Sequence, residues 1–194
     1  GVWNCPTLVV FQKWARRPAA EALFARREMR YVSPFMRMAW APHAPSNYLT
    51  SLPDAAIEAS NRAVPAMQRA VAALRDACRG GAHGGILLGT DMGNPYVLAG
   101  FAVHEELANL AAAGLTPYEA LRAGTSDAAR CMDDGDEWGS IGVGKRADLL
   151  LLSADPLADV GNAAKRVGVV LHGRWFPEEE LAAELERRAR EFEA

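Results

Sequence analysis

The stretch that most constrains the fold is residues 85–91, GILLGTD, in which three consecutive apolar side chains lead to a single carboxylate, Asp91. A short unbroken apolar run beside glycine is typical of a strand buried on both faces, as in a parallel sheet. Helices are predicted on both sides of it, over residues 62–79, where apolar residues recur at helical spacing, and over residues 101–113. This order of elements favours parallel strands covered by helices.

Three further features are expected before residue 62. Residues 6–11, PTLVVF, are predicted to form another short buried strand, because they begin with proline and are β-branched and aromatic. Residues 18–30, rich in alanine, glutamate and arginine, are predicted to be helical. Residues 31–53 contain four prolines and are predicted to form a long loop, which serves either as a lid or binding loop or as surface without a function.

The segment after residue 113 starts with a helix signal. Thr116 suits the N-cap, Pro117 suits the first helical position, and Glu119 completes a capping box. After residue 134 the pattern changes to two glycine-punctuated β segments, residues 139–157 and 166–176, with no helix predicted between them.

The last residues, 177–194, are predicted to be helical because acidic residues precede most of the basic ones, which suits the helix dipole. The apolar stripe of this helix is narrow. We expect it to dock on the body of the protein, with a surface for a partner as the alternative.

Charge and composition exclude several classes of function. A formal net charge of -3 with scattered lysines and arginines argues against a nucleic-acid surface. No apolar run approaches the ~18 residues needed to cross a bilayer. The chain starts without a basic leader, so we expect a cytoplasmic protein with no membrane partner. It also starts without methionine, and could begin inside a longer protein.

Cysteine and histidine spacing gives no local metal motif. The three cysteines are far apart, which indicates reduced thiols rather than disulfides or a zinc knuckle. The four histidines include no HxH or HxxxH pair. Glu105 and Glu106 are adjacent, but neighbouring helix positions point about 100° apart, so we do not expect an acid–base pair.

A series of motifs in a fixed order carries a resemblance to a known family: PTLVV, LLGTDMG, AGFAVHEELANLAAAGLTPYEALRAGTSDAAR, GSIGVGKRADLLLL, DPLADV and VVLHGRW. Together they cover nearly all of residues 1–174. The series resembles the amidohydrolase superfamily, and is most similar to its imidazolonepropionase-like and prolidase-like (dipeptidase) members. The resemblance implies a metal-dependent hydrolase built on a TIM barrel with an appended β-sandwich.

The resemblance places PTLVV at barrel strand seven and GILLGTD at strand eight. A barrel alone takes about 250 residues, so this chain resembles only the C-terminal half of such an enzyme. The implied fold class is α/β, with the last strands and helices of a partial TIM (β/α)8 barrel plus the C-terminal part of a small β-sandwich. The expected domains are residues 1–133 (barrel portion), 134–176 (sandwich portion) and 177–194 (C-terminal helix).

The resemblance also gives Asp91 a catalytic role. At the matching position, family members carry an acid that binds a divalent metal, here expected to be zinc, and shuttles a proton. The family's other ligands, an HxH pair, a bridging lysine or glutamate and two further histidines, are absent from this sequence. The alternative for Asp91 is an ordinary turn residue. We also predict substrate contacts from His104, Asn94 and Tyr96, although each of these could equally be structural.

Two functions follow as alternatives. The first is the C-terminal half of a metal-dependent amidohydrolase that cleaves an amide or other C–N bond of a small molecule, such as a dipeptide or cyclic amide. Such a half would be inactive alone and would need a missing N-terminal half or a homo-oligomer. The second is a non-catalytic fragment that acts as an interaction or scaffold module. A third alternative, an intact small hydrolase that combines Asp91 with His104 and His43, is disfavoured because no motif supports it.

Overall fold

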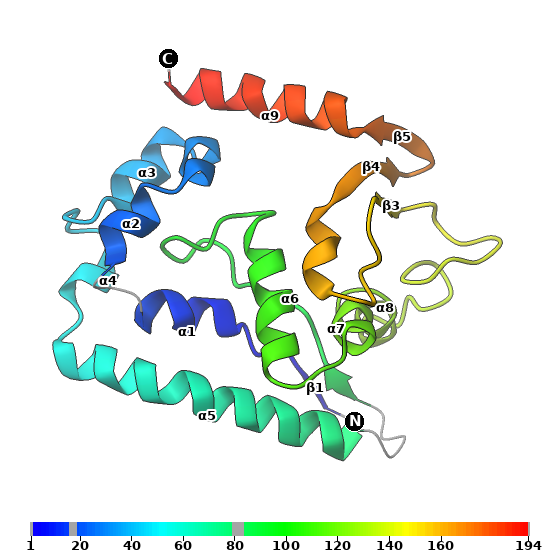
Figure 1. Ribbon diagram of the computed structural model, residues 1–194, viewed down its shortest axis with the longest axis horizontal. Coiled ribbons are helices and arrows are strands. Elements are labelled where there is room, and N and C mark those ends of the chain that lie inside the picture. The colour runs from blue at the N-terminus through cyan, green and yellow to red at the C-terminus, as the bar shows by residue number, and fades with distance from the viewer. Residues whose placement is uncertain (1, 16–18, 79–83, 194) are drawn as a thin grey trace.

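The computed structural model describes residues 2–15, 19–78 and 84–193, and Figure 1 shows the arrangement of their elements. Helix α6 (Ala102–Ala112) lies at the centre. Helices α1 (Leu8–Ala15) and α5 (Asp54–Cys78) pack on α6 and on each other. The short 3₁₀-helix η3 (Val160–Ala164) also packs on α6. The central helix is therefore covered by elements from both ends of the chain.

Two short strands, β1 (Trp3–Asn4) and β2 (Gly85–Ile86), form a parallel pair in which Trp3 lies opposite Gly85. The amide of Leu87 donates to the Asn4 carbonyl over 2.8 Å and extends the pairing beyond β2. Two parallel strands are thus present, as predicted, but the partner of β2 is residues 3–4 and not the predicted residues 6–11. The apolar run up to residue 90 is less regular than predicted, because only Gly85–Ile86 is strand.

The strand predicted over residues 6–11 is wrong, because the strand ends before it and helix α1 begins at Leu8. The reason is a long-range contact. Both carboxylate oxygens of buried Glu106 accept backbone N–H groups at the start of α1, from Leu8 over 2.8 Å and from Val9 over 2.7 Å. These bonds satisfy two N–H groups that a helix start leaves open, and so favour helix over the local β propensity.

The loop predicted over residues 31–53 is also partly wrong. It contains α3 (Pro34–Trp40) and α4 (Tyr48–Ser51), which start after the N-caps Ser33 and Asn47. Pro34 occupies a helix start, where its missing N–H costs nothing. The helix predicted over residues 18–30 is split into α2 (Ala20–Phe24) and a 3₁₀-helix, η2 (Arg27–Tyr31), and residue 18 lies outside the described residues.

The helices after α6 follow the sequence closely. Helix α7 (Pro117–Ala123) starts with the predicted capping box between Thr116 and Glu119. Helix α8 (Ser126–Cys131) follows it directly. Among the described helices, none is both long enough and apolar enough to span a membrane.

The C-terminal strands β3 (Leu149–Leu152), β4 (Arg166–Leu171) and β5 (Arg174–Pro177) form an antiparallel sheet in chain order. Helix η3 lies between β3 and β4, where no helix was predicted. The sheet agrees with a separate β unit, while its place in a sandwich and the three domain limits stay predictions.

Helix α9 (Glu178–Glu193) packs on η2 and on strands β4 and β5, as expected for a helix that docks on the body of the protein. Arg30 of η2 donates to Glu186 of α9 over 3.1 Å, and Ala189 is fully buried. Figure 1 shows α9 spanning from the β unit to the helices of the N-terminal part. The helix therefore joins the two parts of the molecule.

The core includes an apolar cluster around α6 and another between the α2–α4 segment and the loop after β2. The second cluster includes Trp40, Leu49, Tyr96 and Leu98, all buried. This cluster matters for function because it fixes the loop that follows Asp91.

Candidate active site

Asp91 lies in the chain that leaves β2, beyond the end at which the parallel strands β1 and β2 stop. Its side chain is exposed, and its backbone is in the left-handed region, with φ 49°. Aspartate tolerates this conformation better than most residues because its short side chain can bond locally. The chain therefore turns at Asp91 and presents its carboxylate to solvent.

Asn94 orients this carboxylate. Its side-chain nitrogen donates over 2.9 Å to Oδ2 of Asp91 and over 2.9 Å to the Asp91 carbonyl. Tyr48 of α4 in turn donates to the side-chain oxygen of Asn94 over 2.5 Å. The substrate contact predicted for Asn94 stays a prediction, because in this structure its amide is engaged by Asp91 and Tyr48.

Two groups that the sequence analysis did not identify, the Cys5 thiol and the Tyr48 hydroxyl, lie close enough to Asp91 for its charge to affect their pKa values. Burial, then Glu106 and then Asp91 raise the pKa of the Cys5 thiol, which follows β1. Burial raises the pKa of Tyr48, and Asp91 adds to the rise. Both groups are therefore neutral near pH 7.

Gly89 accounts for how closely the two strand ends approach. A β-carbon placed on Gly89 would collide with the sulfur of Cys5. The small residue two positions before Asp91 is thus required by its neighbour after β1.

Tyr96 is fully buried, and its hydroxyl has partners inside the protein. It donates to the Trp40 carbonyl over 2.8 Å and accepts from Asn47 over 2.9 Å. Burial raises its pKa. The predicted contact of Tyr96 with substrate stays untested, and its evident role here is to fix the loop after Asp91 on α3.

His104 lies in the first turn of α6. Its Nδ1 atom is buried and has no hydrogen-bond partner among the residues that the structure describes. Burial lowers the pKa of the imidazole, and Arg166 of β4 lowers it further. The ring is therefore neutral near pH 7 and faces a charge from the β unit, while its predicted contact with substrate stays a prediction.

His43 does not join this group. Its side chain is 90% exposed, and its ring nitrogen lies 3.8 Å from Glu21. The structure therefore gives no support to a site that combines Asp91, His104 and His43.

Glu105 and Glu106 have separate partners, as their helical positions predicted. Glu105 accepts from Lys13 and, over 2.8 Å, from Arg26, whereas Glu106 caps α1. Lys13 is buried, so this pairing ties α1 to α6 beside the site. The Lys13–Glu105 ion pair helps to hold the strand ends in position. Glu105 and Glu106 do not form an acid–base couple.

Comparison with known proteins decides the family. Residues 39–176 match the sequence model of the Amidohydrolase family. This chain belongs to the amidohydrolase family. A search of curated proteins by sequence found no match.

Solved structures agree with this assignment. The chain is similar to the bottromycin amidohydrolase AH, with 31% identity and a TM-score of 0.70 over 96% of this chain and 39% of that one. A candidate prolidase from Bifidobacterium longum is 29% identical, with a TM-score of 0.53 over 85% of this chain and 39% of that one. A Xaa-Pro dipeptidase with methionine bound in its active site shares the fold at 18% identity, with a TM-score of 0.59 over 90% of this chain and 34% of that one.

The chain therefore spans 34–39% of the length of these amidohydrolase structures. Its mixed α/β structure and parallel β1–β2 pair fit part of a TIM-barrel-like fold. The sequence-based assignment to the superfamily as a partial chain is confirmed.

The donor set of this amidohydrolase chain does not make a complete metal site. Within residues 2–15, 19–78 and 84–193, no three histidine, cysteine, aspartate or glutamate side chains are grouped so that they could hold a metal ion. A tight zinc site normally needs at least three protein ligands. Asp91 is a single residue, so a metal site that includes it must be completed from elsewhere.

Proposed function

We propose that this chain is the C-terminal part of a metal-dependent amidohydrolase that cleaves an amide or other C–N bond in a small molecule, such as a dipeptide or a cyclic amide. The observation that carries the proposal is Asp91 itself, an exposed carboxylate that follows a parallel strand pair and is oriented by Asn94. Catalytic groups of barrel enzymes gather at the C-terminal ends of such strands.

In this proposal Asp91 is one ligand of a divalent metal, most simply zinc, and the remaining ligands come from segments beyond this chain. Such an ion, when bound, lowers the pKa of water to about 7. Asp91 would accept the proton that the water releases and return it to the departing amine. Asn94 would keep the carboxylate aimed during both transfers.

The first test concerns the segments beyond this chain. The coding sequence upstream of Gly1 should contain an HxH pair, and hydrolysis should appear only when that segment is expressed with this chain. An upstream sequence without HxH would contradict the proposal. Tight, stoichiometric zinc binding by the present chain alone would also contradict it, because the chain would then not need outside ligands.

The second test concerns Asp91. We expect Asp91→Asn in the completed enzyme to lower kcat/KM by about 10²–10⁴-fold, the range for a lost acid–base group. Asparagine tolerates the left-handed backbone, so the free energy of unfolding should change by less than about 0.5 kcal/mol. Asp133→Asn is the matched control, because Asp133 is also exposed and has φ 59°. Equal activity of the two variants would refute the role of Asp91.

A second candidate function is a non-catalytic interaction or scaffold module. It is favoured by the apolar side chains that β3 exposes, with Leu150 50% and Leu151 54% exposed. Such a module would associate with another chain and would neither bind zinc tightly nor hydrolyse amides. Hydrolysis by the completed enzyme that depends on Asp91 would exclude it.

A further inference from the structure

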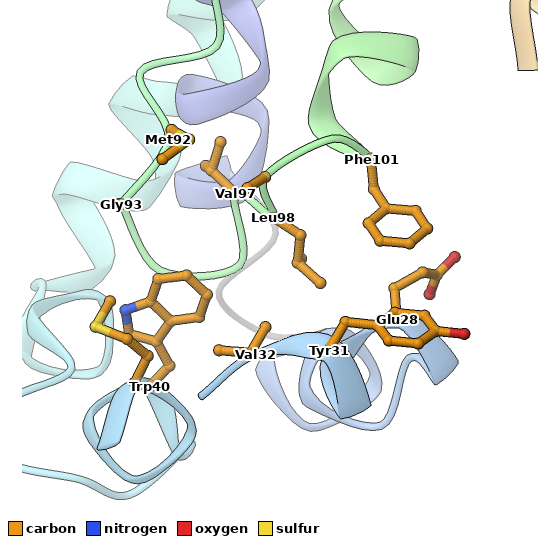
Figure 2. A pocket seen from close by; sticks show the side chains of 11 residues that line it. Glu28, Tyr31, Val32, Trp40, Met92, Gly93, Val97, Leu98 and Phe101 are labelled. Carbon is orange, nitrogen blue, oxygen red and sulfur yellow. The ribbon is translucent and has the colours of Figure 1, made fainter. Parts of the chain in front are cut away.

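A cavity of about 200 Å³ lies beside the loop that follows Asp91. One wall comes from η2 and α3, and the opposite wall comes from residues 92–101, as Figure 2 shows. The side chains that face the cavity are mainly apolar: Tyr31, Val32, Trp40, Val97, Leu98 and Phe101. The cavity is largely apolar and has no part in the chemistry proposed above.

The walls are held in place by a ring stack and by hydrogen bonds. Tyr31 and Phe101 stack, with ring centroids 5.6 Å apart and an angle of 6° between the ring planes. On the other side, Asn47 donates over 2.9 Å both to the Trp40 carbonyl and to the Tyr96 hydroxyl. A pocket whose walls are fixed before binding loses little entropy when a ligand enters. The cavity is therefore preorganised.

The cavity adjoins the chain segment that directly follows Asp91. Met92 and Gly93, which follow Asp91 directly in the chain, line it, and Met92 is 64% exposed. An added β-carbon on Gly93 would meet no atom within 4 Å, so the chain leaves open space at this point. A molecule whose reacting bond lies at Asp91 could thus place an adjoining group in the cavity.

The chemistry of the cavity selects an apolar group. Among the described residues that line it, only Glu28 has a carboxylate. This group lies at one end and is partly neutralised by Arg26, with 3.5 Å between Nε and Oε2. An apolar cavity of about 150 Å³ accepts benzene, so the present cavity can hold a phenyl ring or a branched aliphatic side chain.

We propose that this cavity is a specificity pocket that binds an aromatic or branched aliphatic side chain of the substrate next to its scissile C–N bond. The proposal rests on the proposed function for its position beside Asp91. It goes further, because it assigns the substrate class: peptide-like amides with a large apolar side chain, rather than small or cationic ones.

The test uses the full chain and three neutral-backbone probes: the N-acetyl amides of phenylalanine, glycine and lysine. Backbone amide NMR shifts report where each probe binds. We expect the phenylalanine probe to shift Val97 and Leu98 and to bind at least about tenfold more tightly than the glycine probe, as hydrophobic pockets discriminate by such factors. Equal binding of the two, tighter binding of the lysine probe, or shifts confined to other regions would overturn the proposal.

Two variants sharpen the test. Ala99 lines the cavity and is exposed. Ala99→Phe should therefore fill the pocket and remove the preference for the phenylalanine probe over the glycine probe. A well-dispersed amide NMR spectrum should show that the variant is folded. Ala66 is exposed on α5 away from the cavity, and Ala66→Phe should keep the preference. Should Ala99→Phe fail to fold, Val32→Ala, which enlarges the cavity, should weaken phenylalanine binding. Unchanged binding by either pocket variant would overturn the proposal.

A further variant separates this proposal from the proposed function. Asp91→Asn should leave the binding of the phenylalanine probe unchanged, because the probe needs the pocket and not the carboxylate. Loss of pocket binding with intact dependence of hydrolysis on Asp91 would refute the pocket alone. Retained pocket binding without any hydrolysis in the completed enzyme would refute the proposed function alone.

Discussion

Glu105 and Glu106 are adjacent on α6, but their surroundings shift their ionisation in opposite directions. Burial raises the pKa of Glu106, and the hydrogen bonds from Leu8, Val9 and Asn109 offset only part of this rise. Burial also acts to raise the pKa of Glu105, but the hydrogen bonds and charges of Lys13 and Arg26 outweigh it and lower the pKa. The two side chains therefore link folding to pH with opposite signs.

We predict opposite pH profiles for Glu105→Gln and Glu106→Gln. With its raised pKa, Glu106 contributes stability below its ordinary value of 4.5 and loses it as pH rises through the folded-state value. With its lowered pKa, Glu105 contributes stability above 4.5 and loses it as pH falls through the folded-state value.

Urea unfolding from acid to neutral pH checks this prediction. The stability of the wild type relative to Glu106→Gln should fall as pH rises, and its stability relative to Glu105→Gln should rise. Each variant serves as the control for the other, since both remove one acidic group from the same turn of helix. Parallel profiles would show that the two carboxyl groups do not differ as the contacts imply.

At the residue scale, sequence reasoning singled out Asp91 and Asn94 as candidates because both follow a predicted strand, and their roles stay predictions. It missed Tyr48 and Cys5, which reach the site from other segments. Tyr48 lies in a proline-rich stretch whose helices could not be predicted from periodicity. Its contact with Asn94 could therefore not be predicted from the sequence. Residues that are placed by tertiary contacts alone are the ones that such reasoning cannot find.

At the scale of elements, sequence patterns succeeded where local signals agreed with the fold. The capping box at Thr116 predicted the start of α7 correctly. The PTLVVF segment misled, because Glu106, almost a hundred residues away, supplies the helix cap that turns a strand-like sequence into α1. The decisive contact was distant in the chain, so no local pattern could reveal it.

The segment between α8 and β3 offers a prediction at this scale. Gly139 and Gly144 both have φ 87°, but only Gly139 is enclosed, where a β-carbon would collide with Ala129 and the Thr125 carbonyl of the α8 region. Gly144→Ala should cost only about 1–2 kcal/mol of unfolding free energy for the left-handed backbone. Gly139→Ala should cost about 1–3 kcal/mol more, because its neighbours must shift.

Thermal and urea unfolding of the two variants measure this difference. Gly144→Ala is the control, since it has the same backbone strain without the contact. Equal destabilisation would mean that the segment after α8 does not pack on this helix as the structure shows.

At the scale of the whole molecule, the sequence pattern predicted parallel strands and a separate β unit, although it misplaced the first strand, and it did not predict how the two parts are joined. Helix α9 connects them through Glu186, which pairs with Arg30 of η2, and through buried Ala189. The sequence of α9 showed only a narrow apolar stripe, and such a stripe does not identify the elements on which the helix packs. What covers the β unit on its open side is likewise not encoded in any local pattern.

The β unit itself leads to the last prediction. In the described part of the chain β3 pairs only with β4, so one edge of β3 is open, and Leu151 on it is 54% exposed. An apolar open edge tends to pair with another chain. We therefore expect the present chain, expressed without a companion segment, to self-associate through β3.

Sedimentation velocity over a range of concentrations measures this association. Leu151→Lys should weaken it by at least about tenfold, because it replaces apolar contact with a charge on an edge strand. Leu157→Lys is the control, since Leu157 is 55% exposed but lies outside the strand. A wild-type chain that stays monomeric, or equal weakening by both variants, would show that β3 is not the contact surface. With a companion segment that covers β3, Leu151→Lys should instead weaken the binding of that segment, and the two results together would show which chain the edge of β3 accepts.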